Sequence, residues 1–405
     1  MEVRNISGVN NLSVFYYNNK KFFFFGDLHN QNKNSCDQTQ QCDHFNYHFT
    51  NVESYNSTCT TIGPMLIYWF TYNRNHDIQT DFLLEESMVE KNKKRTYYAT
   101  YNKVMARRRH DNVNVLSTIF PFDNMSWMAL TASILQPCFN NNKLCDFAPT
   151  IKFHAVDIRA LDGDRVSPFA LNFLEEAIDD YRPSLIIHDV IYIIQSLLLN
   201  NHLILSAMMD ENGYATLIDV FQTIISPLSK SIKSLYQKQW DLMSPMFLIK
   251  NIKMHRLAVT MSKLDNAMAN RIKTFILRLA KDYTQPLLSQ FDSLVLKYTK
   301  YFNDEDETQQ RDTLQLLLNH AMNHFTVLSA YMMDAYVLTK IFLAQGDEVI
   351  VYTGAYHIEI YNLFFKQFVD PVIETPTYEH QKCIYIDTLP EILPIQTYRD
   401  YYYKM

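Results

Sequence analysis

The chain has 405 residues and a net charge of −6, with 47% hydrophobic and 20% charged residues, a composition typical of a folded globular protein. This length suffices for two or three domains, or for one α/β domain with insertions. The acidic balance argues against general nucleic-acid binding, and six cysteines are too few for a disulfide framework. Residues 1–11 are polar and lack the apolar core of a signal peptide, which predicts a cytoplasmic protein.

The N-terminal third of the sequence alternates strand and helix patterns. Two β-prone runs, residues 13–17 and 21–25, are joined by Asn18 and Asn19 and predict a hairpin. A helix and two short buried strands are then predicted in turn, at residues 62–72, 81–84 and 151–156. Because strands alternate with helices, the expected sheet is mainly parallel.

A long helical block follows these strands. Residues 167–344 show 3.6-residue periodicity, with breaks predicted at four prolines, Pro183, Pro227, Pro245 and Pro286. The most apolar stretch, residues 190–209, contains several polar side chains, so a buried helix is expected and no membrane span. Strand patterns resume at residues 348–353 and 383–387.

The predicted fold class is therefore α/β, with a mixed, mainly parallel sheet and a large all-helical insertion before the last strands. Residues 1–165 and 346–405 are expected to form one composite α/β domain. Residues 166–345 are expected to form a helical insertion or lid, whose long amphipathic helices would suit contacts with partner proteins.

Two Gly-x-x-His tetrapeptides, each directly after a β-prone run, are the most informative feature of the chain. The first is Gly26-Asp27-Leu28-His29 and the second is Gly354-Ala355-Tyr356-His357, in a sequence with only seven glycines. Ligands of open α/β sheets gather beyond the carboxyl ends of the strands. His29 and His357 are therefore predicted to meet over one site, as metal ligands or acid/base groups; the alternative is two unrelated histidines at strand ends.

Charged residues follow the other predicted strands as well. Glu85 and Glu86 come after one strand, and Asp157 and Arg159 after the next. Burying such clusters separately would be costly, so a shared solvated cleft at one sheet edge is expected. Two histidines with one or two carboxylates match an open site for Zn²⁺ or Mn²⁺ that leaves room for water.

These motifs resemble those of the superfamily that groups TIKI/TraB proteins, erythromycin esterases and ChaN-like proteins. The two tetrapeptides are similar to the paired Gly-x-x-His motifs of TIKI-type metalloproteases. Residues 82–86 resemble the family's strand that ends in Glu, and residues 156–159 resemble the Asp-x-Arg strand end of the erythromycin esterase branch. All four occur in the family's order, with a helical insertion before the last.

The resemblance implies a role for each site residue. His29, Glu85 and His357 would hold the divalent metal, or one histidine would act as general base in the esterase manner. Either Glu85 or Glu86 would serve, since successive strand residues face opposite sides, and the family pattern slightly favours Glu85. Arg159 would neutralise charge developing on an oxygen of the substrate, and Asp157 would orient Arg159. The competing interpretation is an ion pair of Arg159 with a glutamate beside two hydrogen-bonded histidines.

Two functions from different classes follow. The first is metal-assisted hydrolysis of an ester or amide by an activated water. The second is a viral structural or interaction protein on the same fold with a degenerate site. It is favoured by the Asn-, Tyr- and Phe-rich, Gly-poor composition, which indicates an A/T-rich genome such as that of a large DNA virus, and by departures from the family pattern at Asp27 and Met333-Asp334. In that case the location would be the virion or the host cytoplasm.

Three further patterns have structural and functional interpretations. Cys36, Cys42, His44 and His48 could hold a structural zinc ion or simply form a polar loop. His320 and His324 have the histidine spacing of zinc proteases but lack their glutamate, because position 321 is alanine, so packing or surface positions are expected. Basic residues 91–95 and 107–109 flank several tyrosines and could bind nucleic acid or a protein, or form a solvated face.

Overall fold

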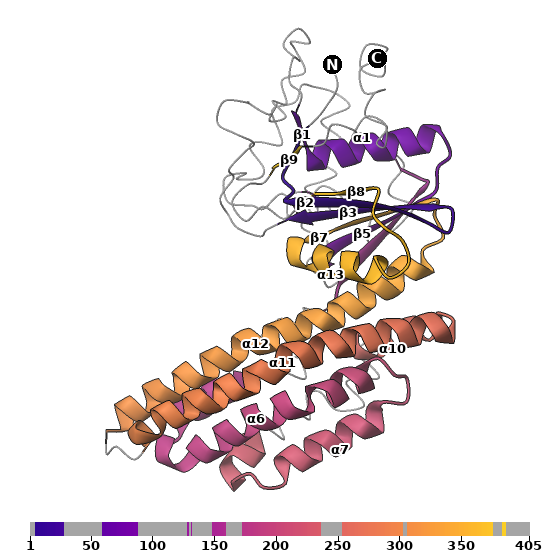
Figure 1. The fold of residues 1–405 in the computed structure, drawn as a ribbon. Helices are drawn as coiled ribbons and strands as arrows, with labels where there is room; N and C mark the ends of the chain where they lie inside the picture. Colours follow the sequence, from indigo (N-terminus) through magenta and orange to yellow (C-terminus); the bar gives the residue numbers. More distant parts are fainter. Residues whose placement is uncertain are drawn as a thin grey trace, which may run out of the picture. The chain divides into compact units, whose positions relative to one another are not determined.

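The computed structural model describes residues 5–27, 59–87, 128, 131, 148–158, 172–235, 253–302, 306–375 and 383–385. The chain folds as two compact units (Figure 1). The sheet unit comprises Met1–Asp157 and Ala344–Met405, and the helical unit comprises Ile158–Leu343. The boundaries expected from the sequence were at residues 165 and 345.

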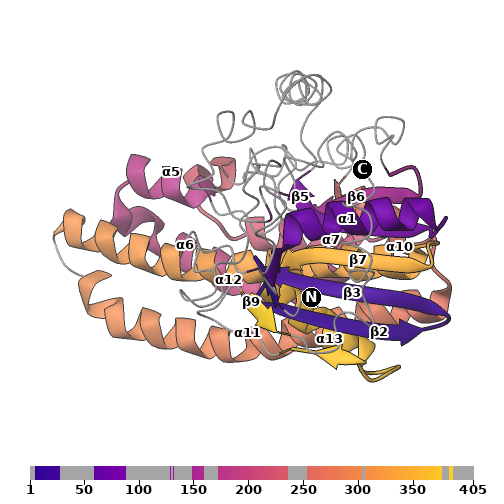
Figure 2. The ribbon, with the colours of Figure 1, turned by 90° about the horizontal axis from the view of Figure 1, so that it is seen from above.

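The main sheet has the strand order β6-β5-β7-β3-β2-β8 within the described part of the chain. The four neighbouring strands β6, β5, β7 and β3 run parallel to one another. β2 is antiparallel to β3, and β8 is antiparallel to β2. Figure 2 shows β2, β3 and β7 side by side. The predicted α/β fold with a mixed, mainly parallel sheet is confirmed. The strands are β2 (Asn11–Tyr17), β3 (Lys20–Asp27), β5 (Thr80–Ser87), β6 (Ile151–Asp157), β7 (Glu348–Gly354) and β8 (Ile373–Glu374).

The predicted hairpin is formed by β2 and β3, which pair in antiparallel register. Its turn residues Asn18 and Asn19 have φ angles of 48° and 60°. Two successive left-handed residues make the turn that matches the twist of a hairpin, and asparagine tolerates this conformation better than most residues. The local sequence thus determines this turn directly.

Helices cover both faces of the sheet. α1 (Ile62–Asn75) lies on one face and α13 (Ala355–Phe365) on the other (Figure 1). Alternation along β3 sends Phe23 towards Trp69 of α1, with ring centroids 4.5 Å apart, and Phe24 towards Phe365 of α13, at 5.0 Å. A strand buried on both faces reads as a continuous apolar run, which is why β3 and β7 stand out in the sequence.

A second, small sheet was not expected from the sequence. It has the order β4-β1-β9, with β1 (Asn5–Ser7), β4 (Cys59–Thr61) and β9 (Cys383–Tyr385). The strand predicted at residues 383–387 therefore belongs to this sheet, and residues 386 and 387 lie outside the described range. These strands are three residues long, too short for a periodic pattern to reveal them.

The helical unit confirms the predicted helical block. Its longest helices α6, α11 and α12 pack against one another. α6 and α12 are long and apolar enough to cross a membrane by length and composition, a test that the buried core helix of a soluble protein also passes, and more than half of each apolar window is buried. The helices are α5 (Asn172–Asp180), α6 (Pro183–Met208), α7 (Tyr214–Ile225), α10 (Lys253–Met261), α11 (Asn266–Phe302) and α12 (Glu307–Leu343).

The prolines act differently from one another. Pro183 is the first residue of α6, and Pro227 follows the end of α7, as expected. The break predicted at Pro286 was wrong, because this proline lies inside α11, an unbroken helix of 37 residues. Packing of α11 along α6 and α12 offsets the lost backbone hydrogen bond. Pro245 lies outside the described residues.

Replacing Pro286 with alanine is expected to stabilise the helical unit by about 1–2 kcal/mol. Its side chain is exposed, so packing changes little. Alanine restores an amide donor and favours the helix by about 3 kcal/mol over proline, while greater freedom of the unfolded chain offsets part of this gain. Urea denaturation followed by circular dichroism measures the effect, with Gln285→Ala, also exposed, as the control. Equal stabilities of the two variants would contradict the expectation.

Candidate functional site

The parallel strands β3, β5, β6 and β7 of the main sheet end at a common edge, and those of the predicted strand-end residues that the structure describes lie along it. Asp27 at the end of β3 pairs in register with Gly354 at the end of β7. Ser87 at the end of β5 pairs with Asp157 at the end of β6. A register shift separates Leu84 from Ser87, so Glu85 and Glu86 occupy a β-bulge. Bulges of this kind redirect side chains and are frequent beside active sites.

Glu85 and His357 come together at this edge. The nearest atoms of the two side chains are Glu85 Oε1 and His357 Nε2, 3.8 Å apart, and the side chains are 4% and 11% exposed. The other carboxylate oxygen, Oε2, accepts a hydrogen bond from the backbone N–H of Gly354 at 2.6 Å. Since Gly354 is the N-cap residue of α13, the carboxylate also lies at the positive end of a helix dipole.

His357 lies beyond the end of β7, in the first turn of α13. β7 ends at Gly354, and the helix begins at the next residue. The side chain therefore reaches Glu85 from the helix, three residues after the strand end. A contact of 3.8 Å is an ion-pair distance and exceeds the length of a hydrogen bond.

Asp27 faces away from this pair. It is completely buried at the end of β3. Burial raises the pKa of Tyr352 well above its ordinary value, and the charge and hydrogen bonding of Asp27 raise it further. Tyr352 belongs to the core cluster beneath α1 with Phe23 and Phe25, so Asp27 lies towards α1, whereas Glu85 lies towards α13.

The structure therefore places the predicted site residues as follows. Glu85 and His357 are adjacent, and Asp157 lies half-buried at the same edge. His29 and Arg159 lie outside the described residues, as does the side chain of Glu86. The Cys36–His48 pattern and the basic stretches at 91–95 and 107–109 also fall outside them.

The donor set that the structure describes is smaller than a catalytic metal site requires. Within the described residues, no three His, Cys, Asp or Glu side chains converge as metal ligands would. Catalytic zinc sites use three protein ligands, and Glu85 with His357 supplies two. The predicted Zn²⁺ or Mn²⁺ therefore depends on His29 as the third ligand.

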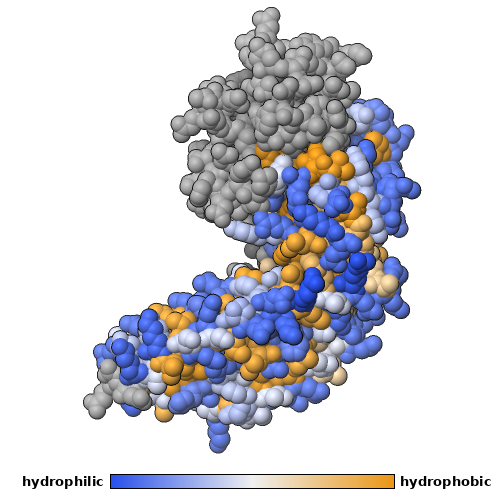
Figure 3. Space-filling model, in the orientation of Figure 1, coloured by the Kyte–Doolittle hydropathy of each residue, from blue (hydrophilic) through white to orange (hydrophobic). Residues whose placement is uncertain are grey.

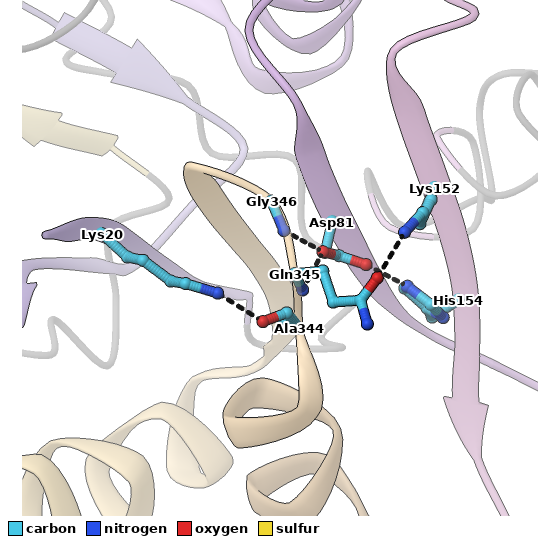
Figure 4. A network of polar contacts seen from close by, with 7 residues as sticks. All are labelled: Lys20, Asp81, Lys152, His154, Ala344, Gln345 and Gly346. Carbon is cyan, nitrogen blue, oxygen red and sulfur yellow. Dashed lines mark hydrogen bonds and ion pairs between the residues drawn. The ribbon is translucent and has the colours of Figure 1, made fainter. Parts of the chain in front are cut away.

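A second polar network, which the sequence did not indicate, lies at the opposite edge of the sheet (Figure 4). Asp81 Oδ1 and His154 Nε2 are 2.7 Å apart, and Asp81 Oδ2 accepts hydrogen bonds from the backbone N–H groups of Gln345, at 2.9 Å, and Gly346, at 2.8 Å. Burial alone would raise the pKa of Asp81, but the hydrogen bonds and charge of His154 and the Gly346 and Gln345 amides together lower it. Through these hydrogen bonds the Asp81 carboxylate fixes the position of Gln345 and Gly346, which precede β7.

Glu348 at the start of β7 forms a comparable buried contact. Its Oε2 accepts hydrogen bonds from Trp69 Nε1 at 2.9 Å and Asn73 Nδ2 at 2.8 Å, both on α1. Lys21 lies 3.9 Å from its other oxygen. These contacts join α1 to the sheet and are structural, because they lie at the amino ends of the strands, away from the edge where α/β sheets bind ligands.

The comparisons with known proteins leave the superfamily resemblance and the implied metal as predictions. No protein-family model, no curated protein and no solved structure matches this chain.

Proposed function

We propose that this protein is a hydrolase that cleaves an ester or amide, with His357 as general base and Glu85 as the group that orients it. One observation carries the proposal: a carboxylate and an imidazole 3.8 Å apart at the carboxyl edge of a parallel sheet. The Gly354 amide holds the carboxylate in place. A base with an orienting acid is the arrangement that water-activating hydrolytic sites require.

Within this proposal each ring nitrogen of His357 has a separate role. Nε2 is the nitrogen that faces Glu85; in the proposed mechanism it carries the proton, and Nδ1 holds the lone pair. Nδ1 would take a proton from water as the water oxygen attacks the carbonyl carbon, and the imidazolium would then protonate the leaving alcohol or amine. Glu85 would stabilise the imidazolium, as carboxylates do beside catalytic histidines.

The other site residues predicted from the sequence have the same roles in this proposal as in the family resemblance. Arg159 would stabilise the oxyanion, and Asp157 would orient Arg159. If His29 completes a site with Glu85 and His357, bound Zn²⁺ or Mn²⁺ would supply a water that is more easily deprotonated. Metal analysis by mass spectrometry of the wild type and of His357→Ala tests this addition, because a metal held by His357 should be lost in the variant.

The test of the proposal is ester and amide hydrolysis by matched variants. We expect His357→Ala to lower kcat/KM for p-nitrophenyl acetate or a fluorogenic amide by about 100-fold, and Glu85→Gln to lower it less. Glu359→Gln makes the same chemical change at an exposed position of α13 and should leave the rate unchanged. Circular dichroism checks folding. Full activity in a folded His357→Ala protein would refute the assignment.

The second candidate function is an interaction protein with a purely structural Glu85–His357 contact. Exposed leucines on the helical unit favour it: Leu185 and Leu199 of α6 are 70% and 56% exposed, and Leu296 of α11 is 78% exposed. Figure 3 shows hydrophobic residues among hydrophilic ones on one face of the molecule. In that case the wild type would hydrolyse the test substrates no faster than His357→Ala does. The His357→Ala and Glu85→Gln substitutions would then lower only the stability of the protein.

A further inference from the structure

Two histidines of the helical unit face each other on one side of α12. His320 and His324 are one helical turn apart, and their Nε2 atoms are 3.1 Å apart. Their rings meet edge to face, with an angle of 87° between the planes and centroids at 4.5 Å. Both side chains are half-buried and so remain accessible to solvent. The two Nε2 atoms thus lie at hydrogen-bond distance from each other at the surface of the helix.

A tyrosine on the neighbouring helix holds one of these rings. The hydroxyl of Tyr283 on α11 lies 3.0 Å from His324 Nδ1. When that oxygen accepts the Nδ1 proton, the lone pair of His324 is placed on Nε2, the nitrogen that faces His320. Metal-binding histidines commonly donate their second ring N–H to such an outer partner.

The spacing of the two nitrogens fits chelation. Imidazole nitrogens bind Zn²⁺ at about 2.0–2.1 Å, so two of them on one ion at ordinary coordination angles lie roughly 3.0–3.4 Å apart. The observed 3.1 Å lies within this range.

We propose that His320 and His324 bind one divalent transition-metal ion through their two Nε2 atoms, with Tyr283 orienting His324. Imidazole ligands select Cu²⁺, Ni²⁺ and Zn²⁺ over Mg²⁺ and Ca²⁺, with Cu²⁺ bound most tightly. No third His, Cys, Asp or Glu joins them among the residues that the structure describes, so water or a small ligand completes the coordination. The site lies on the helical unit and does not depend on the hydrolase proposal.

Calorimetric titration of the full-length protein with Cu²⁺ and Ni²⁺ tests the proposal. We expect His320→Ala and His324→Ala each to lose one equivalent of bound metal, because a single imidazole cannot chelate. Tyr283→Phe should keep the site but weaken it by about tenfold, the effect of removing an outer-shell partner. Electron paramagnetic resonance of the Cu²⁺ complex should report two nitrogen ligands from this site.

The controls separate this site from others in the chain. His188→Ala, at an exposed position of α6, and His357→Ala, in the sheet unit, should leave this equivalent of metal in place. Both α12 variants should stay helical by circular dichroism, since alanine is the best helix former. If the wild type binds neither ion, or if both α12 variants keep the full stoichiometry, the proposal is wrong.

Discussion

Replacing Gly26 with alanine is expected to destabilise the sheet unit by about 3 kcal/mol, the upper part of the range for overpacking a filled core. A Cβ atom at this position would lie 2.7 Å from Ala355 Cα and 1.8 Å from Asn11 Oδ1. Asn11 could rotate, but its side-chain amide donates a hydrogen bond to the backbone oxygen of Ala355. The Cα atom of Ala355 belongs to the backbone at the β7–α13 junction, so it cannot move without displacing the helix that carries His357.

Urea denaturation of Gly26→Ala, followed by circular dichroism, measures this cost. Lys21→Ala on the same strand is the control, because its side chain is 47% exposed and its contact with Glu348 is a long 3.9 Å, so a change within about 1 kcal/mol is expected. In the double variant Asn11→Ala/Gly26→Ala only the side-chain clash is relieved. The double variant should therefore stay well below the wild type in stability, and full recovery would show that Ala355 can adapt.

The close approach at Gly26 explains part of what the sequence revealed. The first Gly-x-x-His motif begins with a glycine directly after a β-prone run, and the structure shows the α13 backbone close to that glycine. Continuous apolar runs likewise revealed β3 and β7, because both faces of the sheet are covered. These features are local or repeat at short intervals, so sequence patterns record them.

Features that depend on distant partners could not be predicted in this way. Asp81 is bonded to a residue 265 positions away, and Asn73 to one 275 positions away. Nothing in the sequence near Asp81 distinguishes a buried, bonded carboxylate from an ordinary charged strand end. The choice between Glu85 and Glu86 was open for a related reason: a β-bulge interrupts the alternation on which such choices rest. Pro286 was misjudged because tertiary packing outweighs its local preference.

Removing the Asp81 carboxylate should have the largest effect on the sheet unit. Asp81→Ala is expected to cost about 3–5 kcal/mol, since Asp81 is 3% exposed and its loss leaves buried donors unsatisfied. Asp81→Asn is the matched control: its oxygen can still accept from the Gln345 and Gly346 amides, while its NH₂ can donate to the other tautomer of His154. Urea denaturation at neutral pH should rank the wild type above the asparagine variant, by about 1.5 kcal/mol, and the alanine variant last.

The pH dependence of this ranking tests its electrostatic origin. Because the folded protein lowers the pKa of Asp81 below its ordinary value of 3.8, the charged carboxylate stabilises the fold fully above that value. This stabilisation is lost as the pH falls through the lower pKa of the folded state. The stability gap between the wild type and Asp81→Asn should therefore be constant near neutral pH and close on acidification below 3.8. A gap that stays constant into acid would contradict the electrostatic origin, since asparagine differs from aspartate here mainly in charge.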